Sequence, residues 1–252
     1  MLARARDPEA AAAVALVVAE IAFAPVAAAD WRLDADVWPY LLASGVFELA
    51  YFALLAAAYS RAELSLVYPL ARGTAPVLVL LVAVLALGAP RSGTQAVGVC
   101  LVALGVLLVR GLRRPAIATG VGFGLAIAAC IAAYTLVDNA GIEHGNPISY
   151  LELSMLLPTI VYAAGVVRWR GRAAVRSEAR LPIVLAGLAT FGAYALVLAA
   201  LERAPAAPVA AVRETSVVIA TALAGVVLGE RVTRSRLAGA IVVVAGVALI
   251  SI

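Results

Sequence analysis

The sequence predicts an all-α polytopic membrane protein with about nine transmembrane helices in two inverted repeats, of four and five helices. Of its 252 residues, 65% are hydrophobic and only 13% are charged, which excludes an ordinary soluble domain. Apolar stretches long enough to cross a bilayer recur along the whole chain. Residues 68–106 and 209–247 also share one sequence pattern without a gap, which indicates an internal repeat.

The apolar stretches define the expected spans, and the loops between them are too short for a globular domain outside the membrane. The first stretch follows Arg4 and Arg6 and so mimics a secretory signal, but Asp7 and Glu9 precede it and favour a retained helix. In chain order the spans are 9–28, 36–58, 64–88, 95–110, 117–138, 148–168, 181–200, 207–228 and 237–251.

The internal repeat divides the chain into residues 1–115 and residues 116–252. At a constant offset of 141 residues, Arg72 matches Arg213 and Thr74 matches Thr215. The four spans of the first part correspond to the last four of the second, so the span 117–138 has no partner. A complete repeat would have five helices, and this odd number places the two halves in opposite orientations.

The arginines of the loops indicate the topology, since the chain contains no lysine. Fourteen of the 19 arginines lie in alternate loops, whereas the opposite loops contain only Arg32, Arg91 and Arg203. By the positive-inside rule the arginine-rich side is cytoplasmic and the C-terminus faces outward. We expect a multi-pass protein of the bacterial inner (plasma) membrane, with the lipid bilayer and not a nucleic acid as its partner.

Two motifs resemble the drug/metabolite transporter superfamily, and in particular its EamA-type carriers of two five-helix repeats. These motifs are the run PLARGTAP from Pro69 to Pro76 and the run from Arg213 to Glu230, which Gly239 follows. The resemblance covers nearly the whole chain. It implies ten helices, so that the first helix would lie upstream of Met1, and it implies transport of small molecules, with export favoured over uptake.

Arg72 and Arg213 are the strongest candidates for substrate contact. A buried arginine costs about 2.5–3.5 kcal/mol on insertion scales, so it requires a partner or a substrate. The alternative is a structural ion pair with a carboxylate on another helix. Pro69 and Pro76 leave backbone carbonyls without their helical donors, which predicts a helix kink on either side of Arg72; an inert packing kink is the alternative.

The acidic residues inside the spans have two candidate roles. A buried carboxylate neutralises an arginine or binds a coupling proton, because burial disfavours its charged form. Neutralisation is favoured for Glu48, and Glu20 is left open between the two roles. Glu214 points about 100° away from Arg213 on a helix and need not pair with it. Glu152 is expected near the outer end of its helix, facing water.

The predicted substrate pocket combines these charges with aromatic and hydroxyl side chains. Tyr134 and Asp138 share one helical face, although Asp138 and Tyr150 could instead lie at the outer membrane interface. The predicted substrate-binding residues are Arg72, Arg213, Glu214, Thr74, Thr215, Tyr51, Tyr134, Asp138 and Glu48, with Tyr150 and Tyr194 beside them.

Glycines seven residues apart form two small-residue stripes, Gly98 with Gly105 and Gly239 with Gly246. Such stripes let helix backbones approach closely, so we interpret them as helix packing, with a homodimer contact as the alternative.

The sequence contains no signature of catalysis, so an enzyme is not expected. A P-loop requires lysine, and neither GxSxG nor HExxH occurs. No metal or other cofactor is expected either.

The resemblance implies a secondary transporter that exports a small metabolite, such as an amino acid or an organic anion, by alternating access, coupled to a proton or a counter-substrate. The alternative is a non-transporting membrane subunit or scaffold of a larger complex.

Overall fold

The computed structural model describes residues 6–62, 64–89, 92–110, 118–216, 219 and 234–250. Within these residues the regular structure is helical, apart from one isolated antiparallel bridge between Leu33 and Gly145. The predicted all-α fold class is therefore confirmed. The helices are α1 (Pro8–Ala29), η2 (Ala35–Val37), α2 (Trp38–Arg61), α3 (Leu64–Leu85), α4 (Gly93–Arg110), α5 (Ala118–Gly141), η3 (Ile142–His144), α6 (Pro147–Glu178), α7 (Leu181–Leu201), α8 (Ala206–Arg213) and α10 (Arg234–Ile250).

Five of the described helical segments are long and apolar enough to cross a membrane. They are Pro8–Ala29, Ala35–Ala58, Ala118–His144, Pro147–Glu178 and Leu181–Leu201, and shorter apolar helices run over Leu70–Leu85, Gly93–Leu108 and Leu237–Ile250. The described helices begin within a few residues of the predicted spans. For the predicted span 207–228 only the beginning can be matched: α8 begins at Ala206 and ends at Arg213, and most of the remainder lies outside the described residues.

Two glycines with positive φ lie just after α3 and inside α6. Gly88 follows α3 with a φ of 69°, and Gly171 interrupts α6 with a φ of 84°. Glycine adopts this backbone conformation without the steric cost that other residues meet. The sequence predicted that the sixth helix would end near residue 168. The structure instead continues it to Glu178, with a break at Gly171 that separates the apolar span from a short polar helix.

The chain forms two compact units, each of which contains helices from both predicted repeats. Residues 1–56 and 137–203 make up unit 1, and residues 57–136 and 204–252 make up unit 2. Unit 1 contains α1, α6, α7 and most of α2, whereas unit 2 contains α3, α4, α8, α10 and most of α5. Compactness does not reveal sequence repeats, so the division near residue 115 stays a prediction.

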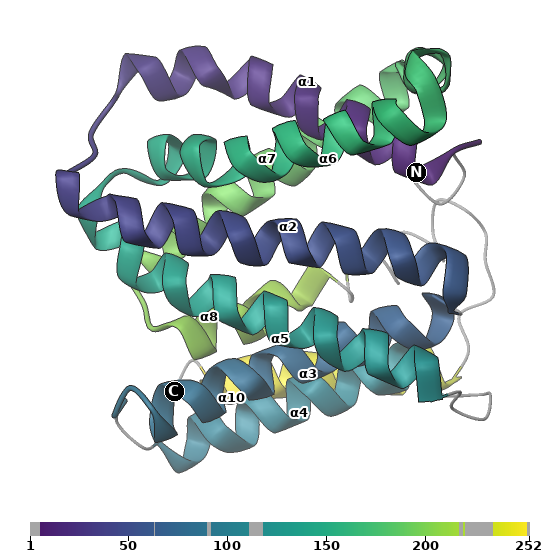
Figure 1. Ribbon diagram of the computed structural model, residues 1–252. Helices are drawn as coiled ribbons and strands as arrows, with labels where there is room; N and C mark the ends of the chain where they lie inside the picture. Colours follow the sequence, from purple (N-terminus) through teal and green to yellow (C-terminus); the bar gives the residue numbers. More distant parts are fainter. Residues whose placement is uncertain are drawn as a thin grey trace. The chain divides into compact units, whose positions relative to one another are not determined.

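In unit 1, α1 packs against α6 and α7 (Figure 1). The side chain of Asp7 caps α1 by accepting hydrogen bonds from the backbone nitrogens of Glu9 and Ala10, each at 3.1 Å. Further along, a β-carbon placed on Gly187 of α7 would clash with the backbone of Ala15 at its carbonyl group. Only glycine permits this close backbone approach between α7 and α1.

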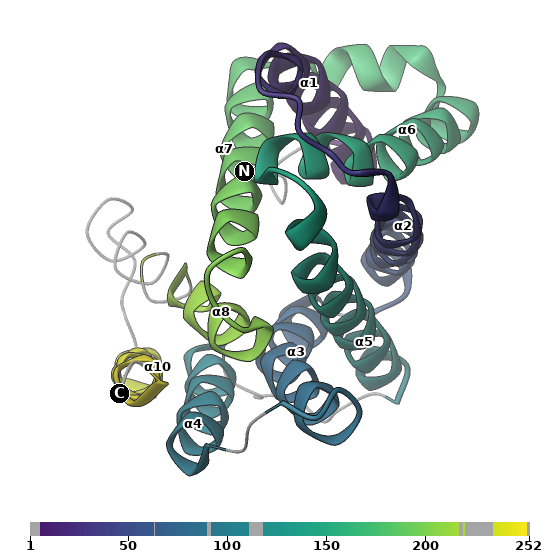
Figure 2. The same ribbon diagram turned by 90° about the vertical axis from the view of Figure 1, so that its left-hand side faces the viewer.

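In unit 2, α10 lies alongside α4, and α3 packs against α4 and α8 (Figure 2). The two glycine stripes face each other across the α4–α10 contact: a β-carbon on Gly98 would lie 2.8 Å from the carbonyl oxygen of Gly246, and one on Gly105 would lie 2.7 Å from that of Gly239. The prediction of helix packing is confirmed. The stripes cover each other within one chain, so a homodimer would need another surface.

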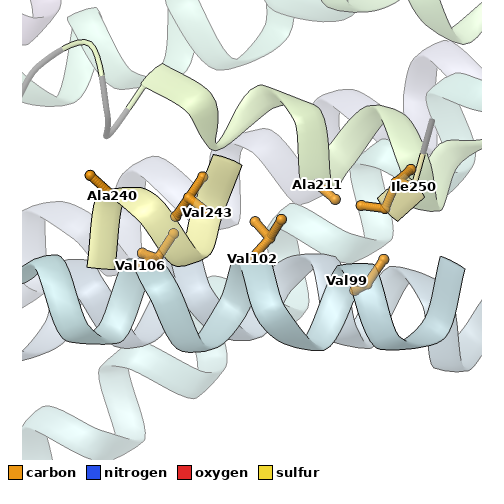
Figure 3. Packing of buried hydrophobic residues seen from close by; sticks show 7 residues of the cluster. All are labelled: Val99, Val102, Val106, Ala211, Ala240, Val243 and Ile250. Carbon is orange, nitrogen blue, oxygen red and sulfur yellow. The ribbon is translucent and has the colours of Figure 1, made fainter. Parts of the chain in front are cut away.

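An apolar cluster fills the space beside these glycines (Figure 3). Its buried members come from α4, α8 and α10, and they are Val99, Val102, Val106, Ala211, Ala240, Val243 and Ile250. Small and β-branched side chains pack here because the glycines bring the two helix axes close together. The cluster therefore fixes α8, whose C-terminal residue is Arg213, against the rest of unit 2.

Candidate functional site

The two predicted arginines meet at one carboxylate in unit 2. Nη1 of Arg72, on α3, lies 3.3 Å from Oε1 of Glu214, and Nε of Arg213 lies 3.9 Å from the same oxygen. Glu214 is fully buried, whereas 25% of the Arg72 side chain and 13% of the Arg213 side chain stay exposed. One buried carboxylate thus lies beside two cations that come from corresponding positions of the two sequence repeats.

The end of α8 places these charges together. Arg213 is the last residue of α8, and Glu214 is its C-cap, with its backbone nitrogen bonded to the carbonyl oxygen of Ala211 at 3.1 Å. A cation at a helix C-terminus interacts favourably with the helix dipole. The sequence predicted a helix that continues past this point. Glu214 keeps right-handed helical angles, with φ −73° and ψ −5°, and Thr215 and Ser216 are helical again.

The surroundings of Arg72 include one residue that the sequence analysis missed. The guanidinium carbon of Arg72 lies 5.4 Å from the ring centroid of Tyr68, which is a cation–π distance. Tyr68 precedes Arg72 by four residues, so helical spacing alone would have identified it.

α3 passes through Pro69 and Pro76 as one α-helix, and the predicted kink at these prolines stays a prediction.

Both predicted threonines lie beside these charged residues in sequence and are partly buried. Thr74 is on α3, two residues beyond Arg72, and Thr215 directly follows Glu214. Tyr134, on the unit 2 part of α5, is buried with 8% of its surface exposed. The role of these three residues in substrate binding stays a prediction.

Unit 1 contains a separate buried group around Asp138. The hydroxyl of Tyr150 donates a hydrogen bond to Oδ1 of Asp138 at 3.0 Å, and the hydroxyl of Tyr194 donates to Oδ2. Asp138 and Tyr150 are both fully buried. Both residues lie near helix ends, Asp138 in the last turn of α5 and Tyr150 in the first turn of α6, so their alternative placement at the outer membrane interface stays a prediction.

Three further carboxyl groups of unit 1 are buried: those of Glu20, Glu48 and Glu152, with 7%, 5% and 9% of their surface exposed. The hydroxyl of Thr159 donates to Oε2 of Glu20 at 3.4 Å. One carboxylate oxygen of each residue has no hydrogen-bond partner among the described residues. The expectation that Glu152 faces water is wrong, because only 9% of its surface is exposed.

The carboxylate that neutralises Arg72 is Glu214, and Glu48 takes part in none of the ion pairs formed among the described residues. Neutralisation, the favoured interpretation of Glu48, therefore finds no support in the described part of the chain.

Tyr51, which precedes Phe52 on α2, lies in the same unit as Glu48, with its ring 5.1 Å from that of Phe52. In the ranges that the structure covers, no group of His, Cys, Asp or Glu side chains has the arrangement of a metal site.

A family model decides the class of protein. The model of the EamA-like transporter family matches residues 1–111 and 118–252. The chain belongs to the EamA-like transporter family. It is thus a multi-pass membrane protein, and the members of its family are transporters and not enzymes.

A comparison with solved structures supports the same fold. A crystal structure of another protein is similar to this chain with a TM-score of 0.75 at 16% sequence identity, and the match covers 100% of this chain and 91% of the other. At this identity the likeness concerns the fold alone. No curated protein matches the chain.

Proposed function

We propose that this EamA-like transporter is a secondary carrier that exports a small anionic or zwitterionic metabolite, such as an organic anion or an amino acid. The main support is the convergence of Arg72 and Arg213, which occupy corresponding positions of the two sequence repeats, on the single carboxylate of Glu214. Arginine binds carboxylates with paired, planar hydrogen bonds. A substrate carboxylate would therefore compete with Glu214 for the same donors.

Alternating access follows from the repeat. Two halves in opposite orientations can exchange their conformations, so that one site opens first to one side of the membrane and then to the other. In this proposal the substrate carboxylate replaces Glu214 as the partner of some of the arginine N–H groups. The partly exposed guanidinium group of Arg72 makes the first contact with the substrate. Thr74, Thr215 and Tyr134 complete the polar surroundings of the substrate.

The buried acids of unit 1 are our candidates for coupling. Glu20 and Glu48 lie on different helices, α1 and α2, and each has a buried oxygen without a described hydrogen-bond partner. A proton satisfies such an oxygen at little steric cost. In liposomes, an imposed pH gradient should drive transport if the coupling species is a proton, and only a gradient of exchangeable metabolite should drive it if the species is a counter-substrate.

The topology belongs to the same proposal. The chain would lie in a bacterial inner membrane with its arginine-rich loops in the cytoplasm and its C-terminus outside. A reporter that is active only in the cytoplasm should then be active when fused after residue 178 and inactive when fused after Ile252. The reverse result would contradict this orientation.

Ligand-dependent thermal stability tests substrate binding. A ligand that binds only the folded protein raises its melting temperature. At a hundredfold excess over Kd, the ligand adds about 2.7 kcal/mol to the free energy of unfolding. Among amino acids, organic anions and organic cations, we expect an acid or an amino acid to stabilise the detergent-purified protein. The Arg213→Ala variant should lose this response, and the Arg203→Ala variant should keep it, because Arg203 is exposed and pairs with the neighbouring Glu202.

Stabilisation by organic cations alone would contradict the proposed substrate class. A response of equal size in the Arg213→Ala variant would move the binding site away from unit 2.

A further inference from the structure

The arginine-rich end of α6 has a positively charged surface, because only some of its arginines form ion pairs within the described part of the protein. The segment from Arg168 to Arg180 has five arginines. Two of them are neutralised: Arg170 lies 2.9 Å from Glu9, and Arg180 lies 3.2 Å from Glu178. The other three are exposed and form no ion pair with any described residue; they are Arg168, Arg172 and Arg176.

Packing holds this surface in place. Ala174 and Val175 pack against buried residues of α1, and the buried carboxylate of Glu178 accepts hydrogen bonds from the backbone nitrogens of Arg6 and Asp7, at 3.0 and 3.2 Å. The short helix after Gly171 is therefore fixed by its apolar side. Arg172 and Arg176 are four residues apart, so they share the opposite face.

The surface lies at the depth of the lipid headgroups. Trp169 stands 22 residues after Pro147, the first residue of α6, a rise of about 33 Å at ~1.5 Å per residue. This length is close to the ~30 Å thickness of the hydrocarbon core. Trp169 is 80% exposed, and tryptophan is enriched at the membrane–water interface. The break at Gly171 directs the chain away from the axis of the preceding span at this depth.

We propose that Arg168, Arg172 and Arg176, together with the ring of Trp169, form a binding site for the headgroups of anionic phospholipids. The three guanidinium groups supply the charge that a phosphodiester headgroup requires, and the Trp169 ring packs at the boundary between headgroups and acyl chains. The proposal concerns unit 1 alone and does not depend on the transport function.

The test compares lipids that differ only in their headgroup. The detergent-purified full chain is titrated with phosphatidylglycerol or with phosphatidylcholine of the same acyl chains, and melting temperature and bound lipid (by native mass spectrometry) are measured. We expect phosphatidylglycerol, and not phosphatidylcholine or inorganic phosphate, to stabilise the protein, and less so at high salt. Each basic residue near an anionic surface contributes about a fivefold factor in affinity, so Arg172→Gln with Arg176→Gln should weaken phosphatidylglycerol binding about 25-fold.

Two further variants separate lipid binding from folding. Arg172→Lys with Arg176→Lys keeps the charge and should keep most of the response. Arg32→Gln with Arg203→Gln removes two exposed arginines that pair with adjacent acids, and it should leave the response unchanged. Equal phosphatidylglycerol binding by the wild type and the Arg172→Gln, Arg176→Gln variant would overturn the proposal, as would equal stabilisation by phosphatidylcholine.

Discussion

Replacing Glu214 with glutamine is expected to lower the free energy of unfolding by about 3 kcal/mol, because the change removes the carboxylate that Arg72 and Arg213 share. Glu214 is fully buried, so water cannot take over the role of its carboxylate. Glutamine preserves the shape of the side chain, removes the charge and replaces one acceptor oxygen with an NH2 donor that arginine cannot accept. The melting temperature of the purified variant, measured without ligand, should fall by several degrees.

Glu202→Gln is the matched control for this prediction. Oε2 of Glu202 lies only 2.9 Å from Nη1 of Arg203, a shorter distance than in the buried pair, but 42% and 71% of these side chains are exposed. Exposed ion pairs contribute little to stability, so this variant should melt close to the wild type. If Glu214→Gln also melted like the wild type, the shared carboxylate would not neutralise the arginines.

Replacing Gly105 with alanine is expected to destabilise unit 2 by about 1–3 kcal/mol through overpacking. The new methyl group would lie 2.7 Å from the carbonyl oxygen of Gly239 and 2.7 Å from the backbone nitrogen of Val243. Both are backbone atoms, so no side-chain rotation relieves the clash, and α4 and α10 must move apart. The melting temperature should fall, and the apolar cluster around Val243 should become accessible to hydrogen exchange.

Gly122→Ala should have the opposite effect. Gly122 lies inside α5, is exposed, and has no heavy atom within 4 Å of the position that a β-carbon would take. Alanine favours a helix over glycine by about 1 kcal/mol, so this variant should be as stable as the wild type or more stable. Destabilisation by both substitutions to the same extent would contradict a specific contact between α4 and α10.

Most of the fold was predictable because membrane helices have a strong sequence signal. Their apolar length fixed the predicted spans to within a few residues, and the spacing of Gly98 and Gly105 identified a packing face. The partner of that face was not predicted, since a stripe of small residues does not show whether its neighbour belongs to the same chain. The extension of α6 to Glu178 was missed because its last turns are polar and carry no membrane signal.

The candidate site was predictable in its residues and less so in its pairings. The internal repeat identified Arg72 and Arg213, because a charge at matching positions of two apolar segments is unusual. Helical geometry suggested that Glu214 need not pair with Arg213, and its carboxylate lies nearer to Arg72, at 3.3 Å, than to Arg213, at 3.9 Å. The sequence did not show that one carboxylate would lie beside both arginines, because it does not show which helices are neighbours. Burial of Glu152 was also missed, since the sequence does not show which helices cover a side chain.

The most direct test of the proposed carrier is substrate flux into liposomes that contain the purified full chain. The substrate is the acid or amino acid that stabilises the protein most. The chain should catalyse uptake of this compound into the liposomes. Both Arg72→Ala and Arg213→Ala should reduce the rate at least tenfold, since about 1.4 kcal/mol of lost binding corresponds to a factor of ten. The control variant Arg203→Ala should transport at the wild-type rate. Undiminished transport by both arginine variants would show that these residues do not bind the substrate, and an absence of flux by the stable wild-type protein would favour a membrane subunit without transport activity.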